Sequence, residues 1–291
     1  MVDMHMHTIY SDGDKSVVEL LKMCEEKRLE YISITDHNTC KQYDDEALQN
    51  NNFFNGKIIK GTELNAIFQN KNIEILAYNI NPSIINEWCE KYYSEDKLRE
   101  EQKLCRKRLL EICDKHGLIY DESNIRRPEK ASEYVEIAIY EELMAHEENH
   151  KILGDFIESY VLFFRKGLAN AESSYFMNYA DFRPHYKEVI DIIHKAGGLA
   201  FLAHPFEYKF EDTIGFINKL QKDAKLDGLE CYHPSAEVDN KHDILVKYAR
   251  QNNLFISGGS DYHGMRKPDI EIGIGNGNLN IPKTLIEEWA K

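Results

Sequence analysis

The sequence has little that would direct the chain into a membrane or out of the cell. No stretch approaches the roughly 18 consecutive apolar residues that a membrane span needs. The first residues, Val2-Asp3-Met4-His5, have neither the basic region nor the apolar region of a secretory signal. We therefore expect a cytoplasmic protein without a membrane partner.

Cysteine is sparse, and its spacing forms no pattern. Six cysteines are scattered over 291 residues without a Cys-x-x-Cys pair. This spacing argues against a thiolate zinc site and gives no disulfide framework. We expect six reduced thiols that lie mostly in the core.

Positive charge is also scarce. The chain has 36 Lys and Arg against 50 Asp and Glu, a formal net charge of −14. An acidic surface repels the phosphates of DNA and RNA, so we do not expect binding to long nucleic acid. A local basic pocket for a small phosphate ester is compatible with this composition.

What the sequence does contain is a repeated alternation of apolar runs and helical patterns. One helix begins at Ser16-Val17-Val18-Glu19, which has the form of a capping box. Further helices are predicted over Tyr186–Lys195, roughly Glu211–Ala224, and Asn240–Gln251. Strands that alternate with helices favour parallel pairing and an α/β architecture. The predicted strands are Val2–Met6, Tyr31–Thr35, Lys57–Gly61, Ile73–Tyr78, Leu199–Ala203, Gly228–Tyr232 and Leu254–Ser257.

The stretch from Pro82 to Arg183 breaks this alternation. Apolar residues recur at helical spacing in a highly charged segment, and Gly117 stands where a C-terminal capping glycine belongs. The helical pattern continues from Glu129 to Asn178. The sequence therefore predicts a core domain in two parts, 1–82 and 187–291, and an all-helical insertion domain over 83–186.

Residues that can bind a metal stand within or just after nearly every predicted strand. Because the strand ends of a βα barrel converge on one face, we expect these side chains to meet there. Imidazole and carboxylate without thiolate suit Zn²⁺, Mn²⁺ or Fe²⁺, and carboxylates that bridge cations suit a site with several metals. The residues are His5, His7, Asp12, Asp36, His37, Glu63, Glu74, His204, His233, Asp261 and His263.

The motifs that carry these residues resemble those of the PHP (polymerase and histidinol phosphatase) family. They are Asp3-Met4-His5-Met6-His7-Thr8 with Ser11-Asp12-Gly13, Ile34-Thr35-Asp36-His37-Asn38, Gly61-Thr62-Glu63, Ala203-His204-Pro205, Gly228-Leu229-Glu230-Cys231-Tyr232-His233-Pro234, and Gly259-Ser260-Asp261-Tyr262-His263-Gly264. The resemblance implies a distorted (β/α)₇ TIM-like barrel with two or three divalent metals. The helical insertion resembles that of a subgroup of small-molecule phosphoesterases, which includes nucleoside 3′,5′-bisphosphate phosphatases.

Carried over residue by residue, the resemblance implies three metal positions. One metal would be held by His5, His7, Glu63 and Asp261, and Glu63 would bridge to a second metal that His204 also binds. A third would be held by Asp12, His37 and His263. The chain departs from the family pattern at Glu74, where a histidine is expected, and at Arg127-Pro128-Glu129, where the subgroup has Arg-x-His. We interpret Glu74 as a further ligand of the second metal.

Other residues are candidates for contacts with the substrate. His233 is our choice for a substrate-contacting residue or for the general acid at the leaving group. Arg127 and Arg183 are predicted to bind substrate, because the guanidinium fork suits phosphate oxygens. Arg126, Arg266 and Lys267 are further candidates for a phosphate clamp, and Glu230 is expected to form a salt bridge inside the barrel.

These observations predict a metal-dependent phosphoesterase that acts on a small phosphorylated metabolite. The substrate would be a nucleotide or sugar phosphate mono- or diester, with metal-bound hydroxide as nucleophile. The alternatives are a histidinol-phosphate phosphatase or a short-oligonucleotide exonuclease. A non-catalytic PHP module that binds metal is a third alternative, which the near-complete set of ligands disfavours.

Overall fold

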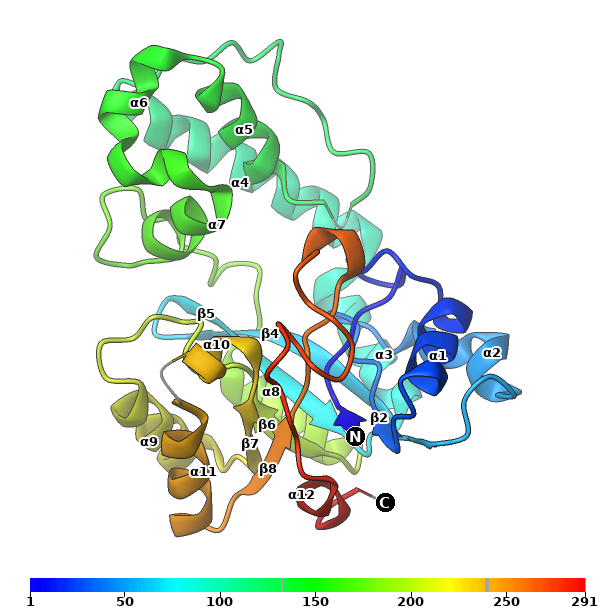
Figure 1. The fold of residues 1–291 in the computed structure, drawn as a ribbon. Coiled ribbons are helices and arrows are strands. Elements are labelled where there is room, and N and C mark those ends of the chain that lie inside the picture. The colour runs from blue at the N-terminus through cyan, green and yellow to red at the C-terminus, as the bar shows by residue number, and fades with distance from the viewer. Residues whose placement is uncertain (132, 239–240, 291) are drawn as a thin grey trace. The chain divides into compact units, whose positions relative to one another are not determined.

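The computed structural model describes residues 1–131, 133–238 and 241–290, which fall into two compact units. The first unit comprises Met1–Ala66, Ile73–Cys89 and His185–Lys291, and the second comprises Ile67–Asn72 and Glu90–Pro184. The first unit contains most of the sheet structure, and the second is mostly helical (Figure 1). The predicted domain boundaries at 82/83 and 186/187 stay a prediction.

The strands form two sheets in a mixed α/β fold. In the first sheet β1 (Val2–Asp3), β2 (Tyr31–Ile32) and β3 (Lys57–Ile58) pair in parallel. The second sheet has the order β4-β5-β6-β7-β8, and β6, β7 and β8 are parallel. Its strands span Gly61–Phe68, Lys71–Tyr78, Leu199–Leu202, Gly228–Tyr232 and Phe255–Gly258.

The prediction of parallel pairing throughout is wrong at one place, because β5 and β6 are antiparallel. The cause is a strand that the prediction missed: β4 follows β3 almost at once and is joined to β5 by the two residues Gln69 and Asn70. Both have positive φ, 47° and 63°, as the two central residues of a type I′ hairpin turn require. This turn reverses the chain, so β5 runs against its neighbour β6.

Isolated parallel bridges connect the two sheets beyond the ends of their regular strands. Met6 pairs with Tyr262, and His37 pairs with Glu63. These bridges bring together the segments that follow β1, β2 and β8 and the start of β4. The predicted closure of all strands into one (β/α)₇ barrel stays a prediction, but the bridges fix which strand ends are neighbours.

Most predicted helices of the first unit are confirmed. α1 (Val17–Glu26) has the full capping box, with reciprocal bonds between Ser16 and Glu19. The helices α8 (Tyr186–Lys195) and α9 (Thr213–Ala224) follow the prediction closely. The last predicted helix is α11 (Lys241–Gln251), and its expected first residue, Asn240, lies outside the described residues. Figure 1 shows α9 and α11 on one side of β6, β7 and β8, and α11 packs against β7 and β8.

The first unit has further helical elements, and the helix over Pro82–Tyr93 continues past Cys89 into the second unit. The 3₁₀ turn η1 (Lys41–Asp44), α2 (Glu46–Gln49) and α3 (Pro82–Tyr93) follow β2 and β5 in sequence. Near the C-terminus lie α10 (Pro234–Glu237), η5 (Gly264–Arg266) and α12 (Lys283–Glu287).

The second unit has its own hydrophobic core. Its longest helix, α4 (Glu95–His116), ends at Gly117 with φ 69°, as the sequence predicts. It is followed by α5 (Val135–Met144), α6 (Glu147–Leu153), η2 (Gly154–Glu158), α7 (Tyr160–Leu162) and the π-helical turn η3 (Phe163–Leu168). The helical prediction fails beyond this point, because residues 169–184 form turns and loops that bury tyrosines against the core.

Two of the expected absences can be compared with the structure. All six cysteines are free and buried, as predicted. In the described part of the chain, no helix is both long and apolar enough to cross a membrane.

Candidate metal centre

All nine predicted metal ligands lie close to other predicted ligands in the structure. Each belongs to at least one group of side chains whose ligand atoms all lie within 4.8 Å of one another. The groups share members, so they form one continuous centre in the first unit. They are His7-Asp12-His37-His263, His5-His7-Asp261, His5-Glu63-His204, His37-Glu63-Glu74 and Glu207-His233-Asp261.

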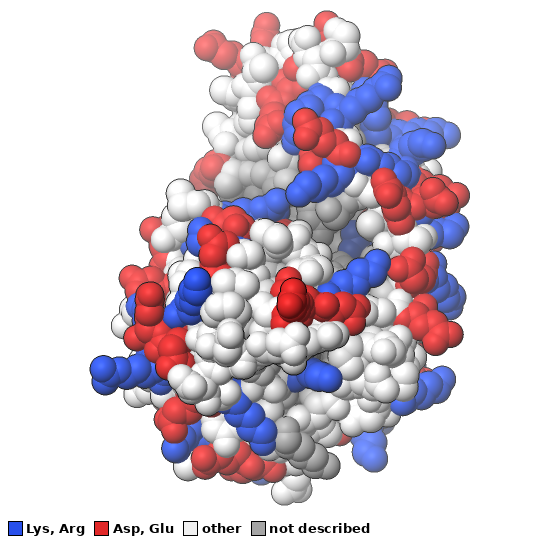
Figure 2. Space-filling model, turned by 90° about the vertical axis from the view of Figure 1, so that its right-hand side faces the viewer, with Lys and Arg blue, Asp and Glu red and all other residues white. Residues whose placement is uncertain are grey.

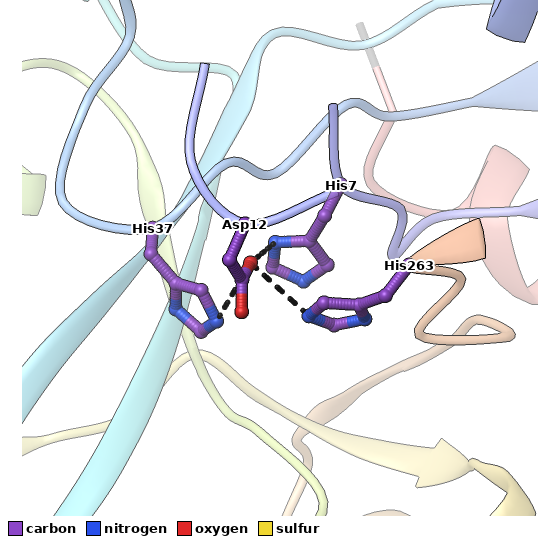
Figure 3. Close-up of side chains that lie close together, drawn as sticks. All are labelled: His7, Asp12, His37 and His263. Atoms are coloured by element: carbon purple, nitrogen blue, oxygen red, sulfur yellow. Dashed lines mark ion pairs between the residues drawn. The ribbon is translucent and has the colours of Figure 1, made fainter. Parts of the chain in front are cut away.

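One group surrounds the carboxylate of Asp12, which lies in the loop after β1. Figure 3 shows the rings of His7, His37 and His263 around this carboxylate. Its Oδ1 lies 3.2 Å from Nε2 of His263 and 3.7 Å from both His7 Nδ1 and His37 Nε2. Three imidazoles and one carboxylate in this arrangement are a donor set that suits a divalent transition metal.

Glu63, in β4, stands at the middle of the centre and uses its two oxygens differently. Its Oε2 lies 3.2 Å from His5 Nε2, 3.4 Å from His7 Nε2 and 3.2 Å from His37 Nδ1. Its Oε1 lies 2.9 Å from Nε2 of His204. A carboxylate that faces separate groups with separate oxygens can bridge two cations.

Glu74 and His204 lie beside Glu63. Glu74, in β5, has its Oε2 3.4 Å from His204 Nε2. It also belongs to the group with His37 and Glu63. Its proximity to these residues agrees with the sequence-based interpretation of Glu74 as a ligand, and the ligand role itself stays a prediction.

The buried histidines have nitrogens that protein groups leave unsatisfied. Within the described residues, His5 Nε2, His7 Nε2, His37 Nδ1 and His204 Nδ1 make no hydrogen bond of acceptable geometry. A buried polar atom without a partner is costly, so such atoms call for an explanation. Since three of them face carboxylate oxygens at 3.2–3.5 Å, bound cations would satisfy them. The residues present therefore fit a metal centre.

A second layer of carboxylates holds the histidines in place. Glu230 accepts a hydrogen bond from His5 Nδ1 at 2.9 Å and from the backbone N–H of His204 at 2.8 Å. This fixes the tautomer of His5 that presents Nε2 to the centre. Glu230 thus has a close partner in His5, a predicted ligand, and its expected salt bridge inside a barrel stays a prediction.

Two aspartates anchor the loops that carry the ligands. Asp36 accepts hydrogen bonds from the N–H and the hydroxyl of Thr8 and from the hydroxyl of Ser11. Asp3 accepts from the N–H and hydroxyl of Ser260 and from the N–H of Gly273. Burial raises the pKa of Asp3 to about 6, although these hydrogen bonds oppose the change.

The backbone is strained at two of the ligand positions. His204 has φ 25° and Asp261 has φ 57°, values that side chains with a Cβ rarely adopt. Hydrogen bonds hold both residues there, from His204 N–H to Glu230 and from Asp261 N–H to the carbonyl of His5 at 2.8 Å. Strain that the surroundings enforce is common where a protein positions functional groups.

Burial and neighbouring charges shift the pKa values of several groups in the centre. Burial opposes a charge on His204, yet Glu63, Glu207 and Glu74 raise its pKa to about 9. Burial likewise opposes the negative charge of Glu63, but the neighbouring histidines hold its pKa well below the usual value. His7 differs, since burial and two neighbouring histidines lower its pKa to about 3. A neutral imidazole is the form that binds a cation.

A further group contains a residue that the sequence reasoning missed. His233, predicted to contact substrate, has its Nε2 3.3 Å from Asp261 Oδ2. Its Nδ1 lies 2.7 Å from the hydroxyl of Ser235 and 4.0 Å from Oε1 of Glu207. Glu207 follows β6 without a motif that would mark it, so only the three-dimensional arrangement reveals it.

The arginine and lysine side chains predicted to bind phosphate lie in different places in the structure. The guanidinium of Arg183 is buried in the second unit and donates to Glu101 at 2.7 Å, and its contact with substrate stays a prediction. Arg127 is exposed in the same unit, and its contact with substrate stays a prediction. Arg126 pairs with Glu133 at 2.8 Å. The remaining two candidates contact the metal centre: Arg266 lies 3.8 Å from Asp12, and Lys267 pairs with Asp261.

The sequence is similar to a known domain family and to proteins of known activity. Residues 3–256 match the PHP domain family. A 5′-3′ exoribonuclease of Haemophilus influenzae is 26% identical, and the match covers 99% of this chain and 98% of that protein. The 5′-3′ exoribonuclease Rnm of Escherichia coli K12 is 25% identical, over 93% of this chain and 87% of that protein.

Two solved structures have a similar fold. A protein of Bifidobacterium adolescentis, provisionally assigned as a metal-dependent phosphoesterase, has a TM-score of 0.66 and 23% identity, and the match covers 99% of this chain and 94% of that chain. A protein of Chromobacterium violaceum described as an amidohydrolase, with bound sulfate and no metal, has a TM-score of 0.67 and 19% identity, over 94% of this chain and 89% of that chain. These two matches concern the fold alone.

Proposed function

This chain belongs to the PHP domain family, and from that premise we propose that it is a metal-dependent hydrolase of phosphoester bonds that degrades RNA from the 5′ end. The proposal rests on two features that occur together in this chain. Nine candidate ligands meet in one centre, and exoribonucleases match the chain over nearly its whole length.

This proposal favours the exonuclease alternative over the small phosphorylated metabolite that the sequence reasoning placed first. The expectation that long nucleic acid is excluded is in tension with the relatives, which are named for their action on RNA. The net charge of −14 can be reconciled with such a substrate. An enzyme that removes nucleotides from one end needs to hold only the last few nucleotides of the RNA. In addition, Figure 2 shows acidic and basic side chains mixed over the face of the molecule that it draws.

We assign the metal positions as the family resemblance implies, with two or three divalent cations of the Mn, Zn or Fe type. Bound cations would lower the pKa of a coordinated water and neutralise charge on the phosphoryl oxygens. Glu63 would face two positions with its separate oxygens, while Glu230 keeps Nε2 of His5 directed at the centre. The bridges Met6–Tyr262 and His37–Glu63 support closure of the strands into the ring that holds these side chains together.

His233 is proposed to carry the proton for the leaving oxygen. Its Nε2 lies 3.3 Å from Asp261, at the edge of the centre, and its Nδ1 is held by the hydroxyl of Ser235. A ring fixed at one nitrogen can present a proton at the other. The leaving group in RNA is a ribose oxygen, which needs protonation more than a nitrophenolate does.

The experiment is a digestion of one oligoribonucleotide labelled at either end, with Mn²⁺ added. We expect mononucleotides to appear at once from the 5′-labelled end and only late from the 3′-labelled end. The DNA oligomer of the same sequence and 4-nitrophenyl phosphate are run beside it. If the protein released phosphate from small esters but left RNA intact, the proposal would be wrong and the protein would be a small-molecule phosphatase.

The control for metal dependence is the Asp261→Ala variant. It removes a carboxylate shared by two of the ligand groups, so metal content and RNA digestion should fall together. If this variant digested RNA at the parent's rate, the activity would not arise from this centre.

A further inference from the structure

Lys267 contacts the metal centre from a side that the nine predicted ligands do not occupy. Asp261 directs its Oδ1 to His5 Nε2 at 3.5 Å and to His7 Nε2 at 3.3 Å. Its Oδ2 faces away from this pair, toward His233 and the ammonium group of Lys267. A cation held by His5, His7 and Asp261 can therefore use Oδ1 without displacing the lysine.

The side of Asp261 where Lys267 lies is open to solvent. The side chains of His5 and His7 are fully buried, and that of Asp261 is 6% exposed. By contrast the side chain of Lys267 is 39% exposed, and that of Glu207 is 28% exposed. A substrate from solution can thus reach Lys267, while His5, His7 and His233 are buried.

The position of Lys267 is fixed by a tight turn. Gly264 has φ 70°, and a Cβ there would overlap the carboxylate of Asp14. That carboxylate accepts a hydrogen bond from the N–H of Met265 at 2.9 Å, and the N–H of Lys267 donates to the carbonyl of Gly264 at 3.0 Å. The turn η5 therefore holds the root of the lysine side chain next to His263, rather than leaving it on a free surface loop.

The positive charge of Lys267 would be able to attract an anion once cations are bound in the centre. A lysine side chain carries a positive charge at neutral pH, and Lys267 directs this charge to the carboxylate of Asp261. When Asp261 shares its negative charge with a bound cation, its attraction for the lysine weakens. An ammonium group is then available for another anion, and a phosphoryl oxygen is the anion that this centre is proposed to receive.

We propose that Lys267 is a phosphate-binding residue, which holds a non-bridging oxygen of the scissile phosphate on the open side of Asp261. The inference rests on the proposed function only for the identity of the substrate as RNA. A purely structural alternative is that Lys267 serves as the counter-charge that keeps Asp261 in place when no cation is bound.

The test compares Lys267→Met with the parent in a binding experiment that needs no turnover. Each protein is loaded with Mn²⁺ and its metal content is measured by mass spectrometry, and inorganic phosphate is then titrated in by calorimetry. Because a hydrogen bond between charged groups is involved, we expect phosphate affinity to fall about tenfold or more while the metal content stays that of the parent. Lys267→Arg, which keeps the positive charge, should recover part of the affinity.

The matched control is Lys27→Met, which breaks a lysine–carboxylate pair with Glu271 at 2.7 Å that belongs to none of the ligand groups. It should bind metal and phosphate as the parent does. Unchanged phosphate affinity in Lys267→Met would overturn the proposal, and loss of metal in that variant would favour the structural alternative. A parent that binds phosphate through Lys267 but leaves RNA intact would contradict the proposed function and not this inference.

Discussion

Glu230 shows how much of the centre depends on residues that touch no cation. Its two oxygens hold the ring of His5 and the backbone N–H of His204, two positions that follow different strands, β1 and β6. One buried carboxylate thus orients two ligands at once. Such supporting contacts are usually needed for affinity, because an imidazole that can rotate or change tautomer binds a metal less well.

The Glu230→Gln variant tests this role. Glutamine is close in size, but it lacks the negative charge that favours the proton on His5 Nδ1. We expect metal affinity to fall about 10–100-fold, with little change in the fold. The measurement is the manganese retained against a graded chelator series, and circular dichroism checks folding. Glu271→Gln is the control, and equal retention by the two variants would show that Glu230 has no part in metal binding.

Glu74 is the departure from the family pattern with the clearest chemical consequence. A carboxylate in place of an imidazole adds a negative charge and a hard oxygen donor, so it should favour Mn²⁺ or Mg²⁺ over Zn²⁺. We therefore expect Glu74→His to take up Zn²⁺ more readily and Glu74→Gln to lose part of its metal. Metal analysis after dialysis against equimolar Mn²⁺ and Zn²⁺ measures both effects. If both variants keep the parent's content and preference, Glu74 is not a ligand.

The predictability of site residues follows from how local their signals are. His5, His7, Asp261 and His263 could be proposed from the sequence because short motifs at strand ends carry them. Glu207 could not, because its place beside His233 depends on how the chain continues after β6. The ion pair of Arg183 could not be foreseen for a similar reason, since its partner Glu101 is 82 residues away in the sequence.

At the scale of elements, the tight turn after His263 connects two of the loops that carry predicted ligands. Gly264 adopts positive φ and packs directly against Asp14, which ties the loop after β1 to the loop after β8. These two loops carry Asp12, Asp261 and His263. A change in this turn should therefore disturb ligands in three of the groups at once.

A pair of glycine variants separates backbone strain from this contact. Gly197 also has positive φ, 78°, but nothing lies within 4 Å of a Cβ placed there. Both Gly197→Ala and Gly264→Ala should lose about 1 kcal/mol of stability from strain. We expect Gly264→Ala alone to lose metal as well, because its methyl group pushes against Asp14. Thermal unfolding and metal analysis of both variants provide the test, and equal metal content in the two would refute the role of the turn.

The elements themselves were predictable where the signal is local. The capping box of α1 and the capping glycine of α4 lie within a few residues of the helix ends that they define. The hairpin of β4 and β5 was missed because Gln69-Asn70 is a weak turn sequence compared with Asn-Gly, and because β4 is buried along its whole length. A strand that is buried on both faces lacks the alternation that identifies strands in a sequence.

At the scale of the whole molecule, the metal centre belongs to the first unit alone. All nine predicted ligands come from segments within Met1–Ala66, Ile73–Cys89 and His185–Lys291. These segments are far apart in the sequence, so cations that bind them together link the beginning and the end of the chain. Metal should therefore contribute to stability as well as to activity.

Removal of metal tests this link. A ligand that binds only the folded chain stabilises it by about 2.7 kcal/mol when its free concentration is 100 times its Kd. We expect the unfolding temperature to rise with added Mn²⁺ and to fall on treatment with EDTA. The Asp261→Ala variant should respond much less to either. If the unfolding temperature of the parent changed with neither Mn²⁺ nor EDTA, the centre would hold no metal that stabilises the fold.

The most direct test of the central claim, that these side chains hold catalytic cations, is a crystal structure with Mn²⁺ or Zn²⁺ and anomalous diffraction at the metal's absorption edge. We predict two or three anomalous peaks among His5, His7, Asp12, His37, Glu63, His204, Asp261 and His263, at about 2.0–2.2 Å from their nitrogen and oxygen atoms for zinc-like ions. Peaks confined to other parts of the surface, in a protein that hydrolyses phosphoesters, would contradict the account.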